Sequence, residues 1–270
     1  MSGFQPADGG GIYGGLDIGS TAVKVVLLDE AGAEAGRALE PSGADLKSAA
    51  AAALAAAVRE AGWKGPDFTR LVATGFGRAV RPDADAAKTE ISCQAKASYH
   101  YVRRAHTLVD IGGQDCKVIR IDTRGVRTGF KMNRKCAAGT GAFLEEAALR
   151  LRIGLNEFDD LARTSIRDVE IGSYCTVFTA TEILHLIRRG VEVRDIVKGV
   201  FGSIIQRTLE MDPLDGDVVM TGGVAAHHPE LVRMLEARLG RPVVVPPWAQ
   251  FTGALGAALF AWEGRTVRHA

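Results

Sequence analysis

Two strand–turn–strand segments, about 90 residues apart, dominate what this chain can fold into. The first carries the turn Asp-Ile-Gly-Ser-Thr at residues 17–21, and the second carries Asp-Ile-Gly-Gly-Gln-Asp at residues 110–115. Aspartate and glycine are typical of tight turns between strands. Between them, an alanine-rich run at 45–61 followed by Gly62 predicts a helix and its end. The alternation of strands and helices indicates an α/β fold with two related lobes.

The predicted elements also set the limits of these lobes. Residues 1–11 are glycine-rich and polar, which predicts a flexible tail. We expect the N-terminal lobe to cover residues 12–106 and the C-terminal lobe residues 107–270. A helix of small residues at 253–264 is left open between two placements, with the C-terminal lobe or packed back on the N-terminal lobe. The two turns are expected to face each other across a cleft.

Composition excludes several classes of function. A chain of 270 residues is long enough for one large or two ordinary domains, and 47% hydrophobic with 24% charged residues is typical of a globular protein. The net charge of +1 gives no reason to expect nucleic acid or an anionic membrane as a partner. No long apolar segment and no secretory leader is recognisable, so we expect a cytoplasmic protein.

The first turn offers the groups that a nucleotide phosphate needs. Gly19 lets the backbone approach a phosphate closely, and Ser20 and Thr21 add N–H and hydroxyl donors. Asp17 is a candidate catalytic residue that could hold Mg²⁺ through water, because Mg²⁺ keeps much of its hydration shell. Lys24, further along the hairpin, is a candidate positive charge for the same phosphates.

The second turn offers the same chemistry to the other side of a triphosphate. Gly112 and Gly113 are the candidate phosphate-binding residues. Asp110, Gln114 and Asp115 are the candidate catalytic residues, with Gln114 or Asp115 placed to orient an attacking water.

A third segment completes a nucleotide site. Gly222 and Gly223 follow an apolar strand and provide a flat surface suited to adenosine. The chain has no GxxxxGK[ST] motif and is therefore not a P-loop protein. Together the three segments resemble the superfamily of actin, sugar kinases and chaperone ATPases. That resemblance implies a two-lobed actin-like fold with duplicated ribonuclease-H-like subdomains, in which the segments are phosphate loop one, phosphate loop two and the adenosine loop.

The four cysteines fall into two pairs. No CxxC motif is present, so a zinc knuckle or a thioredoxin-type site is disfavoured. Cys136 and Cys175 each precede a predicted helix, where free N–H groups and the helix dipole favour a thiolate able to bind a metal. Cys93, within a predicted helix, and Cys116, on a predicted strand, are expected to be buried.

The segments Cys136-Ala-Ala-Gly-Thr-Gly and Cys175-Thr-Val-Phe are similar to one branch of this superfamily. The branch contains the ATP-dependent activators of 2-hydroxyacyl-CoA dehydratases and the ATPase subunits of benzoyl-CoA reductase. The resemblance implies a homodimer with one [4Fe–4S] cluster, held by Cys136 and Cys175 of each subunit, and adds Gly139 and Gly141 to the cofactor-binding residues. It also implies that ATP binding and hydrolysis to ADP drive a low-potential electron to a partner.

The same resemblance implies the partners. They are a second copy of the chain or a similar ATPase subunit, an iron–sulfur CoA-ester dehydratase or reductase, and reduced ferredoxin or flavodoxin as electron source. One departure from the branch is Ala180, which stands where an acidic residue is usual. Two alternatives stay open: a small-molecule kinase with Asp110 or Asp115 as general base, and a nucleotide-switched scaffold without a redox centre.

Overall fold

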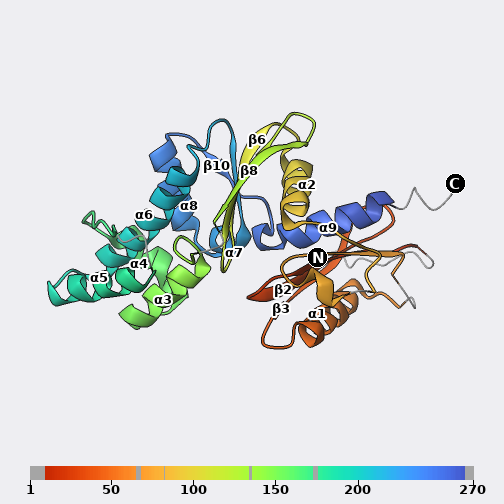
Figure 1. Cartoon of the computed structure of the whole chain (residues 1–270), viewed down its shortest axis with the longest axis horizontal. Helices are drawn as coiled ribbons and strands as arrows, with labels where there is room; N and C mark the ends of the chain where they lie inside the picture. Colours follow the sequence, from red (N-terminus) through yellow and green to blue (C-terminus); the bar gives the residue numbers. More distant parts are fainter. Residues whose placement is uncertain (1–9, 65–67, 82, 134–135, 173–175, 265–270) are drawn as a thin grey trace. The chain divides into compact units, whose positions relative to one another are not determined.

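The chain divides into two compact units, each built on one five-stranded sheet. Unit 1 comprises residues 1–103 and 251–270, and unit 2 comprises residues 104–250. The division thus falls three residues before the one expected from the sequence, and the last helix belongs to unit 1. The computed structural model describes residues 10–64, 68–81, 83–133, 136–172 and 176–264 (Figure 1).

The sheet of unit 1 has the strand order β3-β2-β1-β4-β5. The first three strands form an antiparallel meander, whereas β4 pairs in parallel with β1, and β5 in parallel with β4. Strand β1 is therefore central, and its carboxyl end meets the carboxyl end of β4. The strands are β1 (Tyr13–Ile18), β2 (Ala22–Leu28), β3 (Glu34–Pro41), β4 (Arg70–Thr74) and β5 (Ala86–Ala87).

Helix α1 (Leu46–Ala61) covers one face of this sheet. The Asp45 carboxylate accepts hydrogen bonds from the main-chain N–H groups of Lys47 and Ser48 and so caps the helix start. Gly62 ends the helix in the left-handed conformation, with φ +62°. The predicted helix and its predicted end are both confirmed.

Two helices cover the opposite face. Helix α9 (Thr252–Glu263) packs against β1 and β4, and α2 (Glu90–Val102) packs on α9. Their shared apolar core contains Cys93, Leu255 and Leu259, which confirms the predicted burial of Cys93. In Figure 1 the small-residue helix α9 and helix α1 lie on opposite sides of the strands of unit 1.

The sheet of unit 2 repeats the topology of the first. Its order is β10-β9-β6-β7-β8, with β6, β7 and β8 antiparallel and β9 parallel to β6. Strand β6 takes the central place of β1, and β9 that of β4. The strands are β6 (His106–Ile111), β7 (Cys116–Ile121), β8 (Arg127–Asn133), β9 (Val218–Thr221) and β10 (Val243–Val244).

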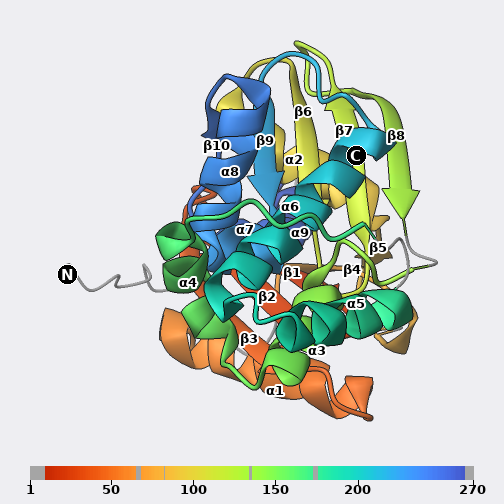
Figure 2. The same cartoon turned by 90° about the vertical axis from the view of Figure 1, so that its left-hand side faces the viewer.

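The helices of unit 2 form one apolar core with its sheet. The longest helix, α6, lies across the strands together with α8, while α3, α4 and α5 lie beyond the carboxyl end of the sheet (Figure 2). Cys116 on β7 is buried in this core, as predicted. The helices are α3 (Gly141–Leu151), α4 (Phe158–Thr164), α5 (Thr176–Arg188), α6 (Val193–Met211), α7 (Gly222–His227) and α8 (Pro229–Leu239).

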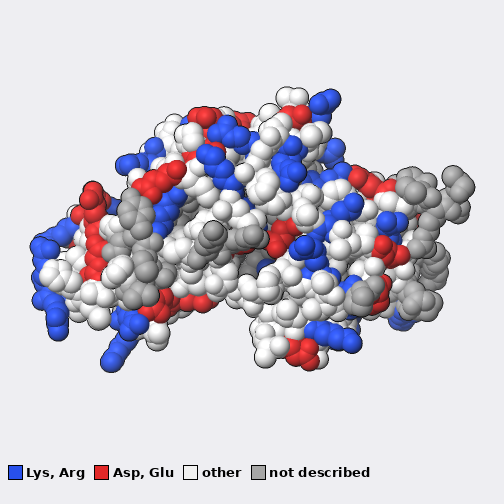
Figure 3. Space-filling view, in the orientation of Figure 1, with Lys and Arg blue, Asp and Glu red and all other residues white. Residues whose placement is uncertain are grey.

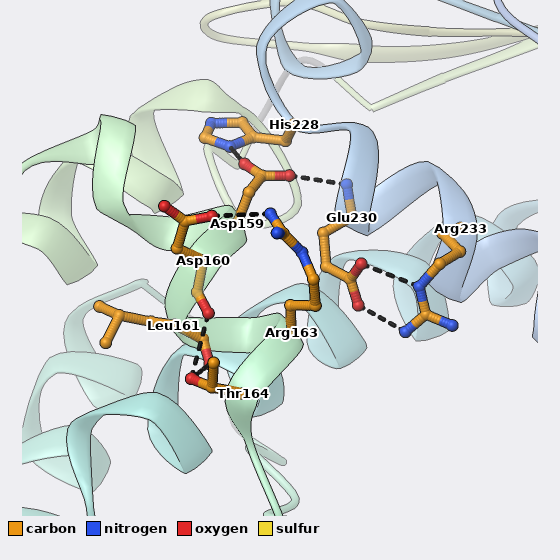
Figure 4. A network of polar contacts seen from close by, with 8 residues as sticks. All are labelled: Asp159, Asp160, Leu161, Arg163, Thr164, His228, Glu230 and Arg233. Atoms are coloured by element: carbon orange, nitrogen blue, oxygen red, sulfur yellow. Dashed lines mark hydrogen bonds and ion pairs between the residues drawn. The ribbon is translucent and has the colours of Figure 1, made fainter.

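A partly buried polar network joins α4 to the start of α8 (Figure 4). One carboxylate oxygen of Asp159 lies 2.7 Å from His228 Nδ1, and the other accepts the main-chain N–H of Glu230 at 2.6 Å. Glu230 in turn makes two hydrogen bonds to Arg233. Because Asp159 satisfies a first-turn N–H of α8, the network is a helix cap that fixes the angle between the two helices.

Charged side chains of both signs are interspersed over the face that Figure 3 shows. None of the helices in the described part of the chain combines the length and the apolar character needed to span a bilayer.

The crossing of α9 and α2 leads to a first prediction. A methyl group at Gly256 would collide with the main-chain carbonyl of Cys93, whereas at Gly202, on α6, it would meet nothing within 4 Å. Gly256→Ala is therefore expected to lower the free energy of unfolding by about 1–3 kcal/mol through overpacking. Gly202→Ala should leave it unchanged or raise it by up to about 1 kcal/mol. Urea unfolding followed by circular dichroism measures both, and equal stability of the two variants would contradict the close crossing.

Candidate nucleotide site and thiol segment

Phosphate loop one, residues 17–21, connects β1 to β2 in unit 1. Asp17 lies opposite Lys24 in the antiparallel register, with 3.7 Å between its carboxylate and the ammonium nitrogen. The main-chain N–H of Gly19 donates to the carbonyl of Ala22 at 3.2 Å and closes the turn. Ser20 and Thr21 are exposed at its tip. The predicted residues of this loop are thus together, with two hydroxyl groups facing solvent.

Main chain encloses the Asp17 carboxylate from two sides. A methyl carbon at Gly75, just after β4, would lie 2.7 Å from Oδ1, and one at Gly253, in the first turn of α9, would lie 2.7 Å from Oδ2. Gly75 also has φ +92°, a backbone conformation that side chains disfavour. Sequence reasoning did not assign either glycine to the site. Both hold the carboxylate at the end of the central strand.

Phosphate loop two, residues 110–115, connects β6 to β7 in unit 2. Asp110 and Lys117 are each only 3% exposed, and their charged atoms lie 3.4 Å apart. Lys117 also lies 2.6 Å from the Asp115 carboxylate, and Thr221 donates its hydroxyl to Asp110 at 3.0 Å. Gln114 is exposed. The structure therefore gathers the three predicted polar side chains on one turn and adds a buried lysine between the two acids.

The two loops are an internal repeat. Both read Asp-Ile-Gly, then four residues, then Lys, and the aspartates are Asp17 and Asp110. In the parallel registers Asp17 lies opposite Thr74, and Asp110 lies opposite Thr221. The residue after each threonine is a glycine with φ +92°. The common spacing of aspartate and lysine is the signal that could have identified Lys117 from the sequence.

The adenosine loop begins directly after β9, and Gly222 and Gly223 open helix α7. A methyl group at Gly222 would collide with the carbonyl of Ile111, so this loop is pressed against the end of β6. Gly223 faces the Gln250 side chain, which lies 2.9 Å from Nε2 of His227. Unit 2 therefore brings together phosphate loop two and the Gly-Gly segment.

The Cys136 segment, residues 136–140, links β8 to α3 and is held by polar contacts. Asn133 donates its side-chain amide to the carbonyls of Cys136, at 3.1 Å, and Ala138, at 3.4 Å. The hydroxyl of the fully buried Thr140 donates to the carbonyl of Ala137 at 2.5 Å. Gly139 is buried, with φ +84°, which lets the segment turn. Cys136 itself is half-buried.

The start of α3 corrects one expectation. The helix begins at Gly141, five residues after the thiol, and its first N–H groups already have partners. Gly141 and Ala142 donate to the carbonyls of Gly112 and Gly113 in loop two, at 2.9 and 2.8 Å. The prediction that free N–H groups of this helix stabilise a Cys136 thiolate is therefore wrong, because those donors bond to loop two.

Cys175 lies outside the described residues. The helix that follows it in sequence, α5, begins at Thr176 and packs beside α3. A groove of about 470 Å³ runs between the two helices, and Ala137, Ala180 and Thr181 contribute to its lining. Ala180, which stands where the related branch usually has an acidic residue, is buried against this groove. The segments that follow the two cysteines are thus neighbours.

The other two cysteines are in environments that suppress thiolate formation. Burial raises the pKa of Cys93 and of Cys116 to about 12 in each case. Both thiols are enclosed in the cores of their units and are not accessible to a metal shared with another chain. Among the described residues, no group of three or more histidine, cysteine, aspartate or glutamate side chains is placed to hold a metal ion. A metal bound at Cys136 thus needs further ligands from outside the described part of one chain.

Comparison with known proteins now identifies the family. Residues 15–261 match the BadF/BadG/BcrA/BcrD ATPase family. The chain belongs to this family. It is 42% identical over 252 residues to the activator of lactoyl-CoA dehydratase from Anaerotignum propionicum, a match that covers 92% of this chain and 96% of the relative.

Solved structures of family members agree with this fold. Component A of the (R)-2-hydroxyglutaryl-CoA dehydratase from Acidaminococcus fermentans superposes with a TM-score of 0.89 at 36% identity, covering 95% of this chain and 99% of that one. The activator of the 2-hydroxyisocaproyl-CoA dehydratase from Clostridium difficile, solved with bound ADPNP, gives 0.88 at 34% identity, covering 95% and 96%. Sugar kinases of much lower identity share the fold alone. The predicted two-lobed actin-like α/β fold is confirmed.

The repeat gives a matched pair of substitutions. Lys117→Met would leave the buried Asp110 carboxylate without its cation, which should lower the free energy of unfolding by about 3 kcal/mol. Lys24→Met removes the equivalent lysine next to the more exposed Asp17 and should cost about 1 kcal/mol or less. Urea unfolding of both variants measures the difference. A smaller loss for Lys117→Met than for Lys24→Met would show that the buried pair does not stabilise unit 2.

The thiol environments predict selective alkylation. At pH 8 about one thiol in ten thousand is ionised when its pKa is about 12. Iodoacetamide should therefore modify the half-buried Cys136 of the native, iron-free protein and leave Cys93 and Cys116 unmodified until the protein unfolds in urea. Peptide mass spectrometry distinguishes the sites. Equal native labelling of Cys93 and Cys136 would contradict the assignment.

Proposed function

We propose that this protein is an ATP-hydrolysing iron–sulfur electron donor that serves a CoA-ester enzyme of the 2-hydroxyacyl-CoA dehydratase type. The observation that carries the proposal is the direct hydrogen bonding between phosphate loop two and the helix that follows the Cys136 segment. In an ATPase family whose relatives include dehydratase activators, this contact joins a nucleotide-binding loop to a thiol that no described disulfide uses.

Each unit contains one loop suited to a nucleotide phosphate. The turn main chain at Gly19, Gly112 and Gly113 has no side chain to keep a phosphate at a distance, while the N–H groups of Gly19 and Gly112 close the turns on the carbonyls of Ala22 and Asp115. Asp17 stands partly exposed at the end of its central strand, where a carboxylate would hold Mg²⁺ through its water shell, and Asp110 is the corresponding buried acid of loop two. Lys24, Ser20 and Thr21 of loop one, and Gly139, Gly141, Gly222 and Gly223 of unit 2, are the further cofactor-binding residues proposed.

Two groups in loop two are suited to position the water that attacks the γ-phosphate. Gln114 is exposed on the turn and can both donate and accept a hydrogen bond. The Asp115 carboxylate is held by Lys117 at 2.6 Å, which keeps it oriented beside the loop. Hydrolysis of ATP requires no covalent intermediate with the protein, so positioning and charge stabilisation suffice.

A four-iron cluster fits the donor set of two chains. Its four thiolates exceed the two that Cys136 and Cys175 of one chain supply, and Cys93 and Cys116 are enclosed in the cores of their units. We therefore assign Cys136 and Cys175 of two identical subunits as the ligands. Cys136 suits this role because it is half-buried on a short segment, not enclosed in the core. When bound, the cluster would supply one-electron transfer at low potential.

The partner enzyme would receive the electron and carry the acyl-CoA chemistry. The named relatives activate dehydratases of lactoyl-CoA and 2-hydroxyisocaproyl-CoA, which favours a separate activator over a permanent subunit of a reductase. Reduced ferredoxin or flavodoxin would reload the cluster. We place this exchange in the cytoplasm, in the absence of oxygen.

Anaerobic iron and sulfide analysis tests the proposal. The reconstituted protein should contain about four irons per two chains. Cys136→Ser and Cys175→Ser should each lose most of that iron, whereas the matched Cys93→Ser and Cys116→Ser should keep it, because those thiols are buried away from any shared site. Iron content that is indifferent to Cys136 would leave only a nucleotide-binding protein.

A further inference from the structure

The Cys136 segment is tied to phosphate loop two at both of its ends. On its carboxyl side, the N–H groups of Gly141 and Ala142 donate to the loop-two carbonyls of Gly112 and Gly113. On its amino side stands Asn133, the last residue of β8, which pairs with Cys116, the first residue after loop two. Both anchors therefore belong to the framework that holds loop two.

Asn133 is the side chain through which this framework fixes the main chain at Cys136. Its amide nitrogen is shared between the carbonyls of Cys136 and Ala138, on either side of Ala137. A single donor group thus fixes the main chain at the thiol-bearing residue itself. A primary amide has the two hydrogens that this double contact needs.

Close packing does not fix the segment in the same way. A cavity of about 360 Å³ lies against it, lined by Ala138 and Gly139 of the segment, by Met132 and Asn133 of β8, and by Arg207 of α6. On the side that borders this space the segment has no atoms of the described residues packed directly against it. The hydrogen bonds of Asn133 and Thr140 therefore contribute to where the segment lies.

We propose that Asn133 is a positioning residue that couples the nucleotide bound at loop two to the Cys136 thiol. When a bound phosphate shifts the loop-two backbone, the start of α3 and the end of β8 shift with it. The hydrogen bond from the Asn133 side chain then transmits this displacement to the carbonyl of Cys136. This inference rests on the proposed nucleotide site and extends it to a named side chain.

Substitution of Asn133 tests the coupling without iron. The tryptic peptide that begins at Cys136 reports the alkylation rate of this thiol in the full-length, iron-free protein at fixed pH, with and without Mg-ADP or Mg-ADPNP. Nucleotide should change the rate by roughly fivefold or more in the unaltered protein, the lower range of coupling between two sites. Asn133→Asp keeps the shape of the side chain but removes its N–H donor, and Asn133→Ala removes both the shape and the donor. In both variants, the change in alkylation rate caused by nucleotide should fall below about twofold.

A matched control lies on the same strand. Thr128 also donates its side chain to a main-chain carbonyl, that of Arg120, but does not contact the Cys136 segment, so Thr128→Ala should keep the full nucleotide response. Nucleotide affinity should stay within about twofold of the unaltered protein in all three variants, which separates coupling from binding.

The outcomes distinguish this inference from the proposed function. A nucleotide response that survives in Asn133→Asp, or that is missing from the unaltered protein, overturns the role of Asn133. Loss of the nucleotide response in Asn133→Asp supports the role of Asn133, whatever the iron analysis finds. Absence of a cluster in the iron analysis would count only against the proposed electron-donor function.

Discussion

The structure depends on how closely main chain approaches the carboxylate at the end of each central strand. In both units a glycine in a left-handed conformation follows the neighbouring parallel strand, and any side chain there would strike the end of the central strand. At Gly75 the obstacle is Ile18 and Asp17, and at Gly222 it is Ile111 and Asp110. This arrangement fixes an anionic group at the end of each central strand, directly before a turn whose glycines let other groups approach the main chain closely.

The two units differ in how deeply this carboxylate is buried and how closely it is paired. Asp110 is almost completely buried and bonds to both Lys117 and Thr221, whereas Asp17 is partly exposed and lies farther from its lysine. A buried, fully paired carboxylate is fixed in place and costly to disturb, while a partly exposed one can still accept water or a metal's water shell. The repeat has therefore kept its framework and diverged in the burial and pairing of its acid.

The sequence allowed the framework to be predicted better than the site. The turns, the helix over 45–61 and the burial of Cys93 and Cys116 follow from local rules: turn residues, a cap, a glycine stop and apolar alternation. Helix α6, the longest of the described helices, was not predicted. Nor could local rules show that Gly253, more than 230 residues from Asp17 in sequence, touches its carboxylate, since that contact depends on the return of α9 to unit 1.

The Cys136 segment shows why the motif that indicated the family also led to a wrong prediction about the N–H groups of the following helix. A helix start usually has unsatisfied N–H groups, and α1 deals with them through its own Asp45 cap. Helix α3 has no side-chain cap, because its N-cap Thr140 uses its hydroxyl to close the Cys136 segment. Its first N–H donors bond instead to the carbonyls of loop two, a partner about thirty residues earlier that no periodicity reveals.

In unit 1 the connection from β3 to β4 spans only 42–69 and holds one described helix, whereas in unit 2 the connection from β8 to β9 spans 134–217 and contains both Cys136 and Cys175. The duplicated sheet supplies the nucleotide loops, and the longer connection of one copy, bonded to its own loop at the start of α3, is where a nucleotide-dependent thiol site can be added without altering either sheet.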